Sequence, residues 1–315
     1  MDIDQYRLAG HIAKRARDYG STLIKEDVLL LDVANAIEDL ILDAGAKPAF
    51  PVNISINDVA AHYSPFHNDS LRFRRGDVVK LDVGVHVDGY IGDTATTVEV
   101  GTRNWQELIV STQEALSIAI ELVGPGCRLG LLCDAIDRSI RARGYTPVRN
   151  LTGHSLGRYT LHAGLSVPNV PDRGADRVVL EAGDAIAIEP FATDGTGRVR
   201  DRGWGDIFAL RGGALLPRLF SEGGGAKPFK GDIPKREHPK DSGLLSIIQQ
   251  KYGSLPFAGK WCIGYVPDAP RELRELVRTN KVRAYRVLVE ESGGMVAQTE
   301  HTVVVTDDGK EIVTQ

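Results

Sequence analysis

The 315-residue chain lacks any apolar stretch near the roughly 20 residues that a membrane-spanning helix requires. It has little cysteine, and Cys127, Cys133 and Cys262 stand at unrelated spacings, which excludes a disulfide framework and a paired-cysteine zinc site. The formal net charge is −4 and no long basic run occurs, so we expect no direct binding to nucleic acid or to an anionic membrane. The charged start of the chain shows no secretory signal. We therefore expect a cytoplasmic protein with reduced cysteines.

What the chain does contain is helical and strand-like patterning in a regular order. Apolar residues at helical spacing predict helices over 4–19, 27–44, 105–123 and 129–143, and strand-like patterns cover 50–56 and an apolar hairpin over 77–100. Asn104 and Glu107 have the spacing of a capping box at the start of the third helix. Two helices before a hairpin, then two more before further strands, indicate a duplicated α+β unit.

A short sequence repeat supports this duplication. Gly76-Asp77-Val-Val-Lys-Leu-Asp82 and Gly183-Asp184-Ala-Ile-Ala-Ile-Glu189 each place a carboxylate five residues after the Asp of a Gly-Asp pair. If the two segments are equivalent strands, Glu189 is the counterpart of Asp82 and faces the same site. The spacing between the two copies is far too long for a solenoid repeat.

The hairpin itself predicts a site. Asp88-Gly89 is a strong signal for a two-residue turn, which would place Asp82 opposite Ala95 and Gly84 opposite Asp93. Asp82 and Asp93 then share one face of the hairpin as a diagonal pair, roughly 7–8 Å apart between backbones. Converging carboxylates repel unless a proton or a cation lies between them, so the pattern indicates a metal site. The alternative is a solvated hairpin with two surface aspartates, although Asp is uncommon inside an apolar strand.

The C-terminal third changes character. Gly-rich and Pro-rich sequence over 212–243 predicts an irregular loop, and helical patterns follow over 244–252 and 271–279. We interpret 206–285 as an insertion that bears a small helical subdomain. Strand-like segments over 295–305 and 311–313 are expected to return to the main sheet.

Several further residues could complete the site, but each is weak when taken alone. They are scattered along the chain: His62, His154, His162, Glu189, Glu300 and His301. A lone histidine is more often a surface or hydrogen-bonded residue than a ligand, and zinc signatures such as His-Glu-x-x-His are absent. Spacing alone does not bring these residues together.

Taken in order, the sequence blocks around these residues resemble a known family. The blocks are Ala-Phe50-Pro-Val-Asn, Ala-Ala-His62-Tyr, Lys-Leu-Asp82-Val-Gly with Gly-Asp93-Thr-Ala, Asn-Leu-Thr-Gly-His154-Ser with Leu-His162-Ala-Gly, Ile-Glu189-Pro-Phe and Glu300-His-Thr. Together they are similar to type II methionine aminopeptidases of the short archaeal form. The resemblance implies an α+β pita-bread fold, in which two pseudo-symmetric halves surround a curved antiparallel sheet. It also implies a catalytic domain over 1–205 and 286–315 and a type II helical insertion over 206–285.

The resemblance further implies a dinuclear hydrolase with two divalent cations, of cobalt, manganese or iron. The implied ligands are Asp82, Asp93, His154, Glu189 and Glu300, with Asp93 and Glu300 bridging the two ions. This oxygen-rich set favours such ions over a thiolate-type zinc site. A metal-activated hydroxide would attack the first peptide bond, and Glu189 would also move the proton of the water.

The remaining implied roles concern the substrate. His162 would donate a hydrogen bond to the substrate carbonyl, and His62 would contact the scissile nitrogen. The slot for the methionine side chain would be lined by Phe50, His62, Leu161, His162 and Phe191. Expected substrates are the N-termini of nascent polypeptides, met at the ribosome, and the protein is expected to act as a monomer.

Two rival interpretations remain at this point. Xaa-Pro aminopeptidases and prolidases share the five-ligand set, so the ligands alone do not discriminate among these peptidases. Some pita-bread proteins have lost the ligands and bind RNA or proteins, whereas this chain keeps all five. One departure from the family pattern is Thr299, which stands where a bulky Phe is usual and would enlarge the space behind Glu300 or shift its strand.

Overall fold

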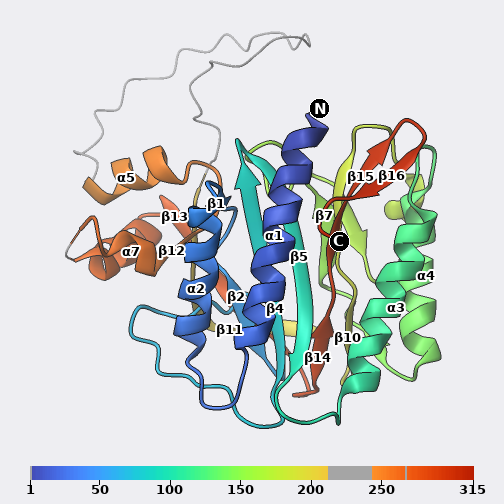
Figure 1. Ribbon diagram of the computed structural model, residues 1–315, viewed down its shortest axis with the longest axis horizontal. Helices are drawn as coiled ribbons and strands as arrows, with labels where there is room; N and C mark the ends of the chain where they lie inside the picture. The colour runs from blue at the N-terminus through green and yellow to red at the C-terminus, as the bar shows by residue number, and fades with distance from the viewer. Residues whose placement is uncertain (1, 212–242, 267) are drawn as a thin grey trace.

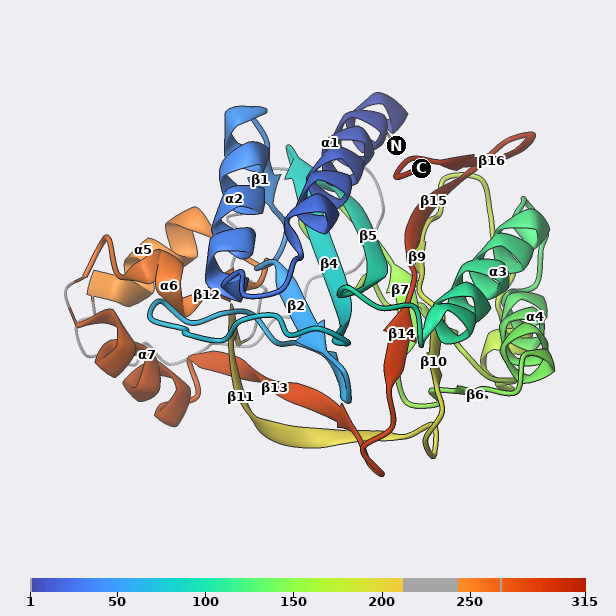
Figure 2. The same cartoon turned by 60° about the horizontal axis from the view of Figure 1, so that its bottom comes forward.

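A computed structural model describes residues 2–211, 243–266 and 268–315. Two helix pairs cover a strongly curved antiparallel sheet system, one pair on each half (Figures 1 and 2). Helices α1 (Ile3–Leu23) and α2 (Leu30–Asp43) cover the first half, and α3 (Gln106–Leu122) and α4 (Leu129–Ala142) cover the second. All four helices were expected, so the predicted α+β class with a duplicated helix pair is confirmed.

The strands form several short sheets that share this curvature. In the first half, β4 (Val78–Val87) pairs with β1 (Lys47–Pro48), β2 (Asn53–Ile56) and β5 (Tyr90–Glu99). In the second half the order is β16 (Gly309–Ile312), β15 (His301–Thr306), β9 (Ala185–Ile188), β7 (Thr152–Ser155) and β8 (Ser166–Pro168). A third sheet joins β14 (Val296–Gln298), β10 (Phe191–Thr193) and β6 (Thr146–Pro147), and a short 3-10 helix covers Ala175–Arg177.

The hairpin β4–β5 has the predicted register. Asp82 pairs with Ala95 and Gly84 pairs with Asp93, and the turn residues Asp88 and Gly89 both have positive φ. The flanking apolar side chains Leu81, Val83 and Val85 are fully buried under α1 and α2. The register is therefore fixed by the turn and by one buried apolar face together.

The Gly-Asp repeat marks equivalent turns in the two halves. Gly76 and Gly183 both have positive φ, which favours glycine. Asp77 Oδ2 accepts a hydrogen bond from the Arg74 amide at 2.7 Å, and Asp184 Oδ2 accepts one from the Glu181 amide at 2.8 Å. Each Asp thus closes the turn that starts a central strand, and the strands carry Asp82 and Glu189 to one cavity.

The predicted capping box at α3 is wrong. Trp105 is the N-cap and makes no side-chain cap bond, whereas Glu99 at the end of β5 accepts hydrogen bonds from the amides of Asn104 and Trp105 at 2.6 and 2.9 Å. The carboxylate of Glu99 thus satisfies free amides and lies at the positive end of the helix. Strand β5 supplies the cap from outside the helix.

Strands β11 (Val199–Leu210) and β13 (Val282–Glu290) form a long antiparallel ribbon that also pairs with β3 (Val59–Ala61). The segment between them carries α5 (Gly243–Lys251), β12 (Phe257–Ala258), α6 (Gly259–Cys262) and α7 (Ala269–Arg278), which share an apolar core of their own. The expected loop over 212–243 falls almost wholly outside the described residues. The expected helices over 244–252 and 271–279 are confirmed as α5 and α7.

A buried polar clamp joins this helical segment to the rest of the fold. The Glu38 carboxylate on α2 accepts from Lys260 Nζ at 3.0 Å and from Trp261 Nε1 at 2.8 Å, while Asp206 on β11 accepts from the Lys260 amide at 2.9 Å. The side chains of Glu38 and Lys260 are both buried. Because a half-broken buried pair leaves a charge without a partner, this clamp fixes how the segment sits on α2.

The clamp should make stability depend on pH through Asp206. Burial raises the pKa of Asp206 from 3.8 to about 7, so the folded state holds a proton that the unfolded state releases between these values. The free energy of unfolding should therefore fall as pH rises from about 4 to 7, by at most about 4 kcal/mol at 1.36 kcal/mol per pKa unit. Urea unfolding at pH 5 and pH 8 measures how far the free energy of unfolding differs between these two pH values. This difference should be smaller in Asp206→Asn than in the wild type. It should stay unchanged in Asp201→Asn, an exposed position on the same strand; equal pH dependence in all three proteins would contradict the assignment.

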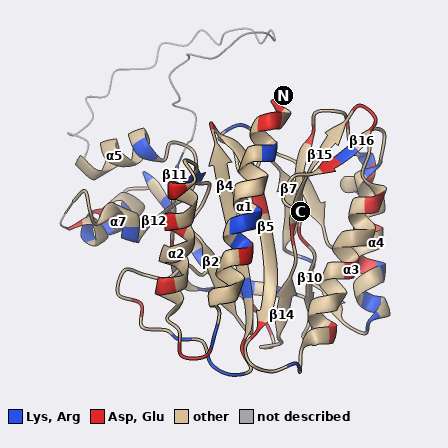
Figure 3. Ribbon diagram, in the orientation of Figure 1, with Lys and Arg blue, Asp and Glu red and all other residues tan. Residues whose placement is uncertain are grey.

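The helices carry both signs of charge on their outer faces, as Figure 3 shows for α1, α3 and α4. All three cysteines are free, as expected. No helix among the described residues combines the length and the apolar character that crossing a membrane would require.

Candidate metal centre

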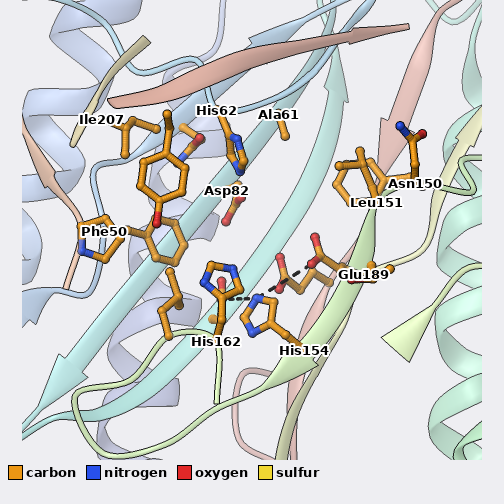
Figure 4. A pocket seen from close by; sticks show the side chains of 18 residues that line it. Phe50, Ala61, His62, Asp82, Asn150, Leu151, His154, His162, Glu189 and Ile207 are labelled. Atoms are coloured by element: carbon orange, nitrogen blue, oxygen red, sulfur yellow. Dashed lines mark ion pairs between the residues drawn. The ribbon is translucent and has the colours of Figure 1, made fainter. Parts of the chain in front are cut away.

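A cavity of about 240 Å³ lies where the two halves meet, and it brings together all the predicted metal ligands and substrate-contacting residues (Figure 4). Its lining includes Phe50, His62, Asp82, Asp93, His154, Leu161, His162, Glu189, Phe191 and Glu300. His301, which the sequence also singled out, is not in this lining; its Nδ1 lies 2.9 Å from Thr314 Oγ1.

Five strands deliver the acidic and imidazole groups. Asp82 lies on β4, Asp93 on β5 and His154 on β7. Glu189 directly follows β9, and Glu300 directly precedes β15. Each group therefore rests on a sheet rather than on a free loop, which favours a rigid site.

These side chains approach one another closely. His154 Nε2 lies 3.7 Å from Asp93 Oδ2 and 3.9 Å from Glu189 Oε1. Asp93, His154 and Glu300 each offer one ligand atom within 4.8 Å of the others, and all three residues are buried. This is the spacing of groups that ligate a common ion.

The carboxyl groups of the cavity are close together and poorly solvated, which favours a bound positive charge. Burial, reinforced by the neighbouring carboxylates, raises the pKa of Asp93, Glu189 and Glu300 well above the usual range, and burial raises that of Asp82 to about 7. Burial lowers the pKa of His154 to about 3, so this imidazole is neutral and free to ligate. Oxygens Oδ1 of Asp82 and Oδ1 of Asp93 are buried without a hydrogen-bond partner among the described residues. Divalent cations fit this donor set, because they would neutralise the carboxylates and satisfy both orphaned oxygens.

The bridge between the two halves runs through Asp93 and Glu300. Ala95 and Glu300 form an isolated β-bridge, and the Thr302 hydroxyl both accepts from the Asp93 amide and donates to its carbonyl at 2.8 Å. Thr94 Oγ1 donates to the Glu300 carbonyl at 2.8 Å. These backbone contacts hold the two carboxylates at a set separation without using their side chains.

One residue near the carboxylates was missed by the sequence analysis. Gln298 Nε2 donates to Glu189 Oε2 at 3.1 Å and to Glu300 Oε2 at 3.3 Å. The amide therefore orients two of the five predicted ligands, as outer partners in metal sites do. Its place two residues before Glu300 in the sequence was the available signal.

The two histidines that were predicted to contact the substrate, His62 and His162, also line the cavity. The His154 and His162 rings lie 4.4 Å apart between centroids, and His162 is the more exposed of the two. Burial lowers the pKa of His62 to about 4 and, with help from the positive charge of Arg283, lowers that of His162. Both imidazoles are thus neutral near pH 7 and can each donate one hydrogen bond.

The apolar wall combines predicted and unpredicted residues. Phe50, Leu161 and Phe191 are joined by Ile207, Pro256 and Tyr285, three residues that the sequence analysis missed because they come from the inserted segment and the ribbon that carries it. Phe50 packs against Gly84, where a Cβ would lie 2.1 Å from the ring and would push it into the cavity. Figure 4 shows Phe50 and Ile207 on one side of the cavity and His154 with Glu189 on the other.

Thr299, which was expected to enlarge the space behind Glu300 or to shift its strand, contacts α3. Its hydroxyl lies 2.7 Å from Thr112 Oγ1 on α3, and a separate cavity of about 510 Å³ lies beside it, between α1 and α3. The segment that carries Glu300 is thus joined to α3 by a hydrogen bond. A larger side chain at position 299 would instead fill part of this cavity.

Comparison with known proteins gives concordant results. The model of metallopeptidase family M24 matches residues 4–307. The methionine aminopeptidase of Pyrococcus horikoshii is 42% identical to the chain, and the comparison covers all of both sequences. A solved methionine aminopeptidase from Thermotoga maritima superposes with a TM-score of 0.69 at 24% identity, over all of this chain and 96% of that one. Pyrococcus furiosus prolidase superposes with a TM-score of 0.59 at 19% identity and is covered over only 64% of its length.

The predicted pita-bread fold is confirmed, and a buried Asp, His and Glu cluster in this family indicates use of a divalent metal.

Proposed function

The chain belongs to metallopeptidase family M24, and on that premise we propose that it removes the N-terminal initiator methionine from proteins and peptides. The observation that carries the proposal is the cluster of Asp82, Asp93, His154, Glu189 and Glu300 beside an apolar slot. Asp93 and Glu300 are proposed to bridge two divalent cations, Asp82 to chelate one, and His154 and Glu189 to bind the other. Such a pair of cations polarises a carbonyl and lowers the pKa of water to near neutrality.

The side chains of the cavity would supply the remaining chemistry. Glu189 would take a proton at its carboxylate and pass it to the departing amine. Gln298 would hold Glu189 in place during this transfer. His162 would donate a hydrogen bond to the substrate carbonyl, and His62 would contact the scissile nitrogen.

Selectivity would come from the shape of the cavity. Phe50, Leu161 and Phe191 would pack against the thioether of methionine, a contact that sulfur makes well with aromatic edges. A free α-amine would lie beside Asp82, so that only the first residue of a chain is cleaved. Proposed substrates are the N-termini of nascent polypeptides in the cytoplasm, met at the ribosome by a monomeric enzyme without direct contact to nucleic acid.

We also propose the division of the chain into two functional parts. The catalytic domain would comprise 1–205 and 286–315, and residues 206–285 would be the type II helical insertion. The supporting observation is the separate apolar core of α5, α6 and α7. Pro256 of this segment lines the cavity, so the insertion would help to shape the methionine slot.

A peptide screen tests the proposed function. Metal-free protein is reconstituted anaerobically with manganese, iron or cobalt and offered Met-Ala and Ala-Pro peptides. Release of methionine from the first, with no cleavage of the second, is the expected result. Preferential cleavage of Ala-Pro peptides would instead establish the Xaa-Pro aminopeptidase activity of more distant relatives.

A further inference from the structure

The rim of the cavity carries an arginine that the proposed mechanism does not use. Arg283 and Tyr285 lie two residues apart on β13, so their side chains leave the same face of the strand. Tyr285 lines the cavity, and its ring meets the His62 ring edge-on with 5.3 Å between centroids. Arg283 is exposed, and its guanidinium lies 4.7 Å from the Tyr285 ring centroid.

Tyr285 holds this guanidinium in a defined place. Arg283 Nη2 donates to Tyr285 Oη at 2.5 Å, and the cation lies over the ring. Among the described residues no carboxylate lies within ion-pair distance of Arg283, whereas Arg202 on the neighbouring strand pairs with Asp58, and Arg198, just before that strand, pairs with Glu291. The guanidinium fork has five N–H donors, so the contacts that it makes with the described residues leave donors for an incoming anion.

Arg283 is exposed and touches Tyr285, which lines the cavity. His162 is the exposed histidine of the lining, and the positive charge of Arg283 lowers the pKa of both His162 and His62. The negative charge of Asp201, an exposed residue, raises the pKa of His62 and so acts against the effect of Arg283. Asp201 makes no ion pair with Arg283 among the described residues. A peptide chain that leaves the slot past His162 would thus enter the field of Arg283.

Distance sets which part of the peptide is in reach. The His62 ring and the Arg283 guanidinium are at most about 10 Å apart, given their separations from Tyr285. An extended peptide covers about 3.3–3.6 Å per residue, so this limit corresponds to at most about three residues beyond the scissile nitrogen.

We infer that Arg283 is a carboxylate-binding residue that selects substrates bearing a negative charge at the third or fourth residue, with methionine as the first. The inference rests on the proposed function and adds a second specificity determinant to it. The carboxylate is either an Asp or Glu side chain of a longer chain or the free C-terminus of a short peptide. In both cases the guanidinium donates N–H groups to the carboxylate oxygens while Tyr285 keeps it in position.

Paired peptides test this inference on the metal-loaded enzyme. Met-Ala-Ala-Glu-amide is compared with Met-Ala-Ala-Gln-amide for the side-chain source, and Met-Ala-Ala is compared with Met-Ala-Ala-amide for the C-terminal source. For at least one pair, kcat/KM should favour the charged member about two- to fivefold, the range that an exposed ion pair produces. The preference should appear mainly in KM and should shrink at high salt.

Variants assign the effect to Arg283. In Arg283→Gln the charged-to-neutral ratio should fall to about one, and in Arg283→Lys it should be intermediate because the bidentate fork is lost. Arg271→Gln, an exposed position on α7 with the same change in net charge, should keep the wild-type ratio. A wild-type ratio of one for both pairs, or an unchanged ratio in Arg283→Gln, would overturn the inference while methionine release itself stands. No release from any of the four peptides by wild-type enzyme would overturn the proposed function and this inference together.

Discussion

Replacing Glu300 with glutamine is expected to abolish methionine release while leaving the protein folded. Glu300 is buried and, in the proposed site, shares both cations with Asp93. An amide offers one neutral oxygen where a bridging ligand needs two charged ones, so the variant should lose at least one cation. The loss of activity should exceed the about 10²–10³-fold effect of removing a single stabilising hydrogen bond. Asp93→Asn should behave in the same way.

The fold should survive because the contacts between the two halves use backbone and threonine groups. Ala95 pairs with Glu300 through its main chain, and Thr302 and Thr94 bond the carbonyls of Asp93 and Glu300. None of these bonds needs the Glu300 carboxylate. Circular dichroism and unfolding should therefore report a native protein.

Stability without metal gives an independent check of the same substitution. Burial raises the pKa of Asp82 to about 7, and burial together with the neighbouring carboxylates raises that of Glu300, so ionisation penalises the folded state as pH rises. Removing one carboxylate relieves part of this penalty. In excess chelator at pH 8, Glu300→Gln should melt at the same temperature as the wild type or higher, and added metal should raise Tm mainly in the wild type.

Glu291→Gln provides the matched control, because Glu291 is an exposed glutamate beyond the end of β13. It should keep wild-type metal content and turnover. Wild-type activity or full metal occupancy in Glu300→Gln would refute the bridging role.

Local sequence was enough for one part of the site. The Asp88-Gly89 turn and the apolar alternation set the register of β4 and β5, and that register placed Asp82 and Asp93 together. The Gly-Asp repeat extended the argument to Glu189, because each repeat closes an equivalent turn before a central strand. These features act over a few residues, so pattern and turn chemistry could predict them.

Long-range contacts were beyond such reasoning. His154 and Glu300 lie far from the hairpin along the chain, and only the resemblance to a family joined them to it. The prediction of the cap of α3 was wrong for the same reason. Glu99 on β5 binds the free amides at the start of the helix, in place of the predicted local pair Asn104 and Glu107. Tyr285 and Gln298 also act through neighbours brought close by the fold.

Replacing His162 with alanine should produce the second large effect, with a different signature. His162 lies beside His154 but is not among the proposed ligands. Partial loss of solvation beside the cavity wall, with the positive charge of Arg283, keeps its pKa below the usual value, so it is neutral at pH 7 and above. A neutral imidazole can donate one N–H to the substrate carbonyl, where negative charge develops during attack. Its loss should lower kcat about 10²–10³-fold with little change in KM, because the bond strengthens in the transition state.

Metal content separates this defect from the loss of a ligand. His162→Ala should bind wild-type amounts of metal and melt near the wild-type temperature, since its side chain is exposed at the mouth of the cavity. His162→Gln keeps a donor and should recover part of kcat, whereas His67→Ala, at an exposed histidine outside the cavity lining, should match the wild type. If His162→Ala instead loses metal in proportion to activity, the imidazole is a ligand, and the five-residue set would have to be redrawn around it. If kcat is unchanged, His162 does not stabilise the developing charge and the role assigned to it is wrong.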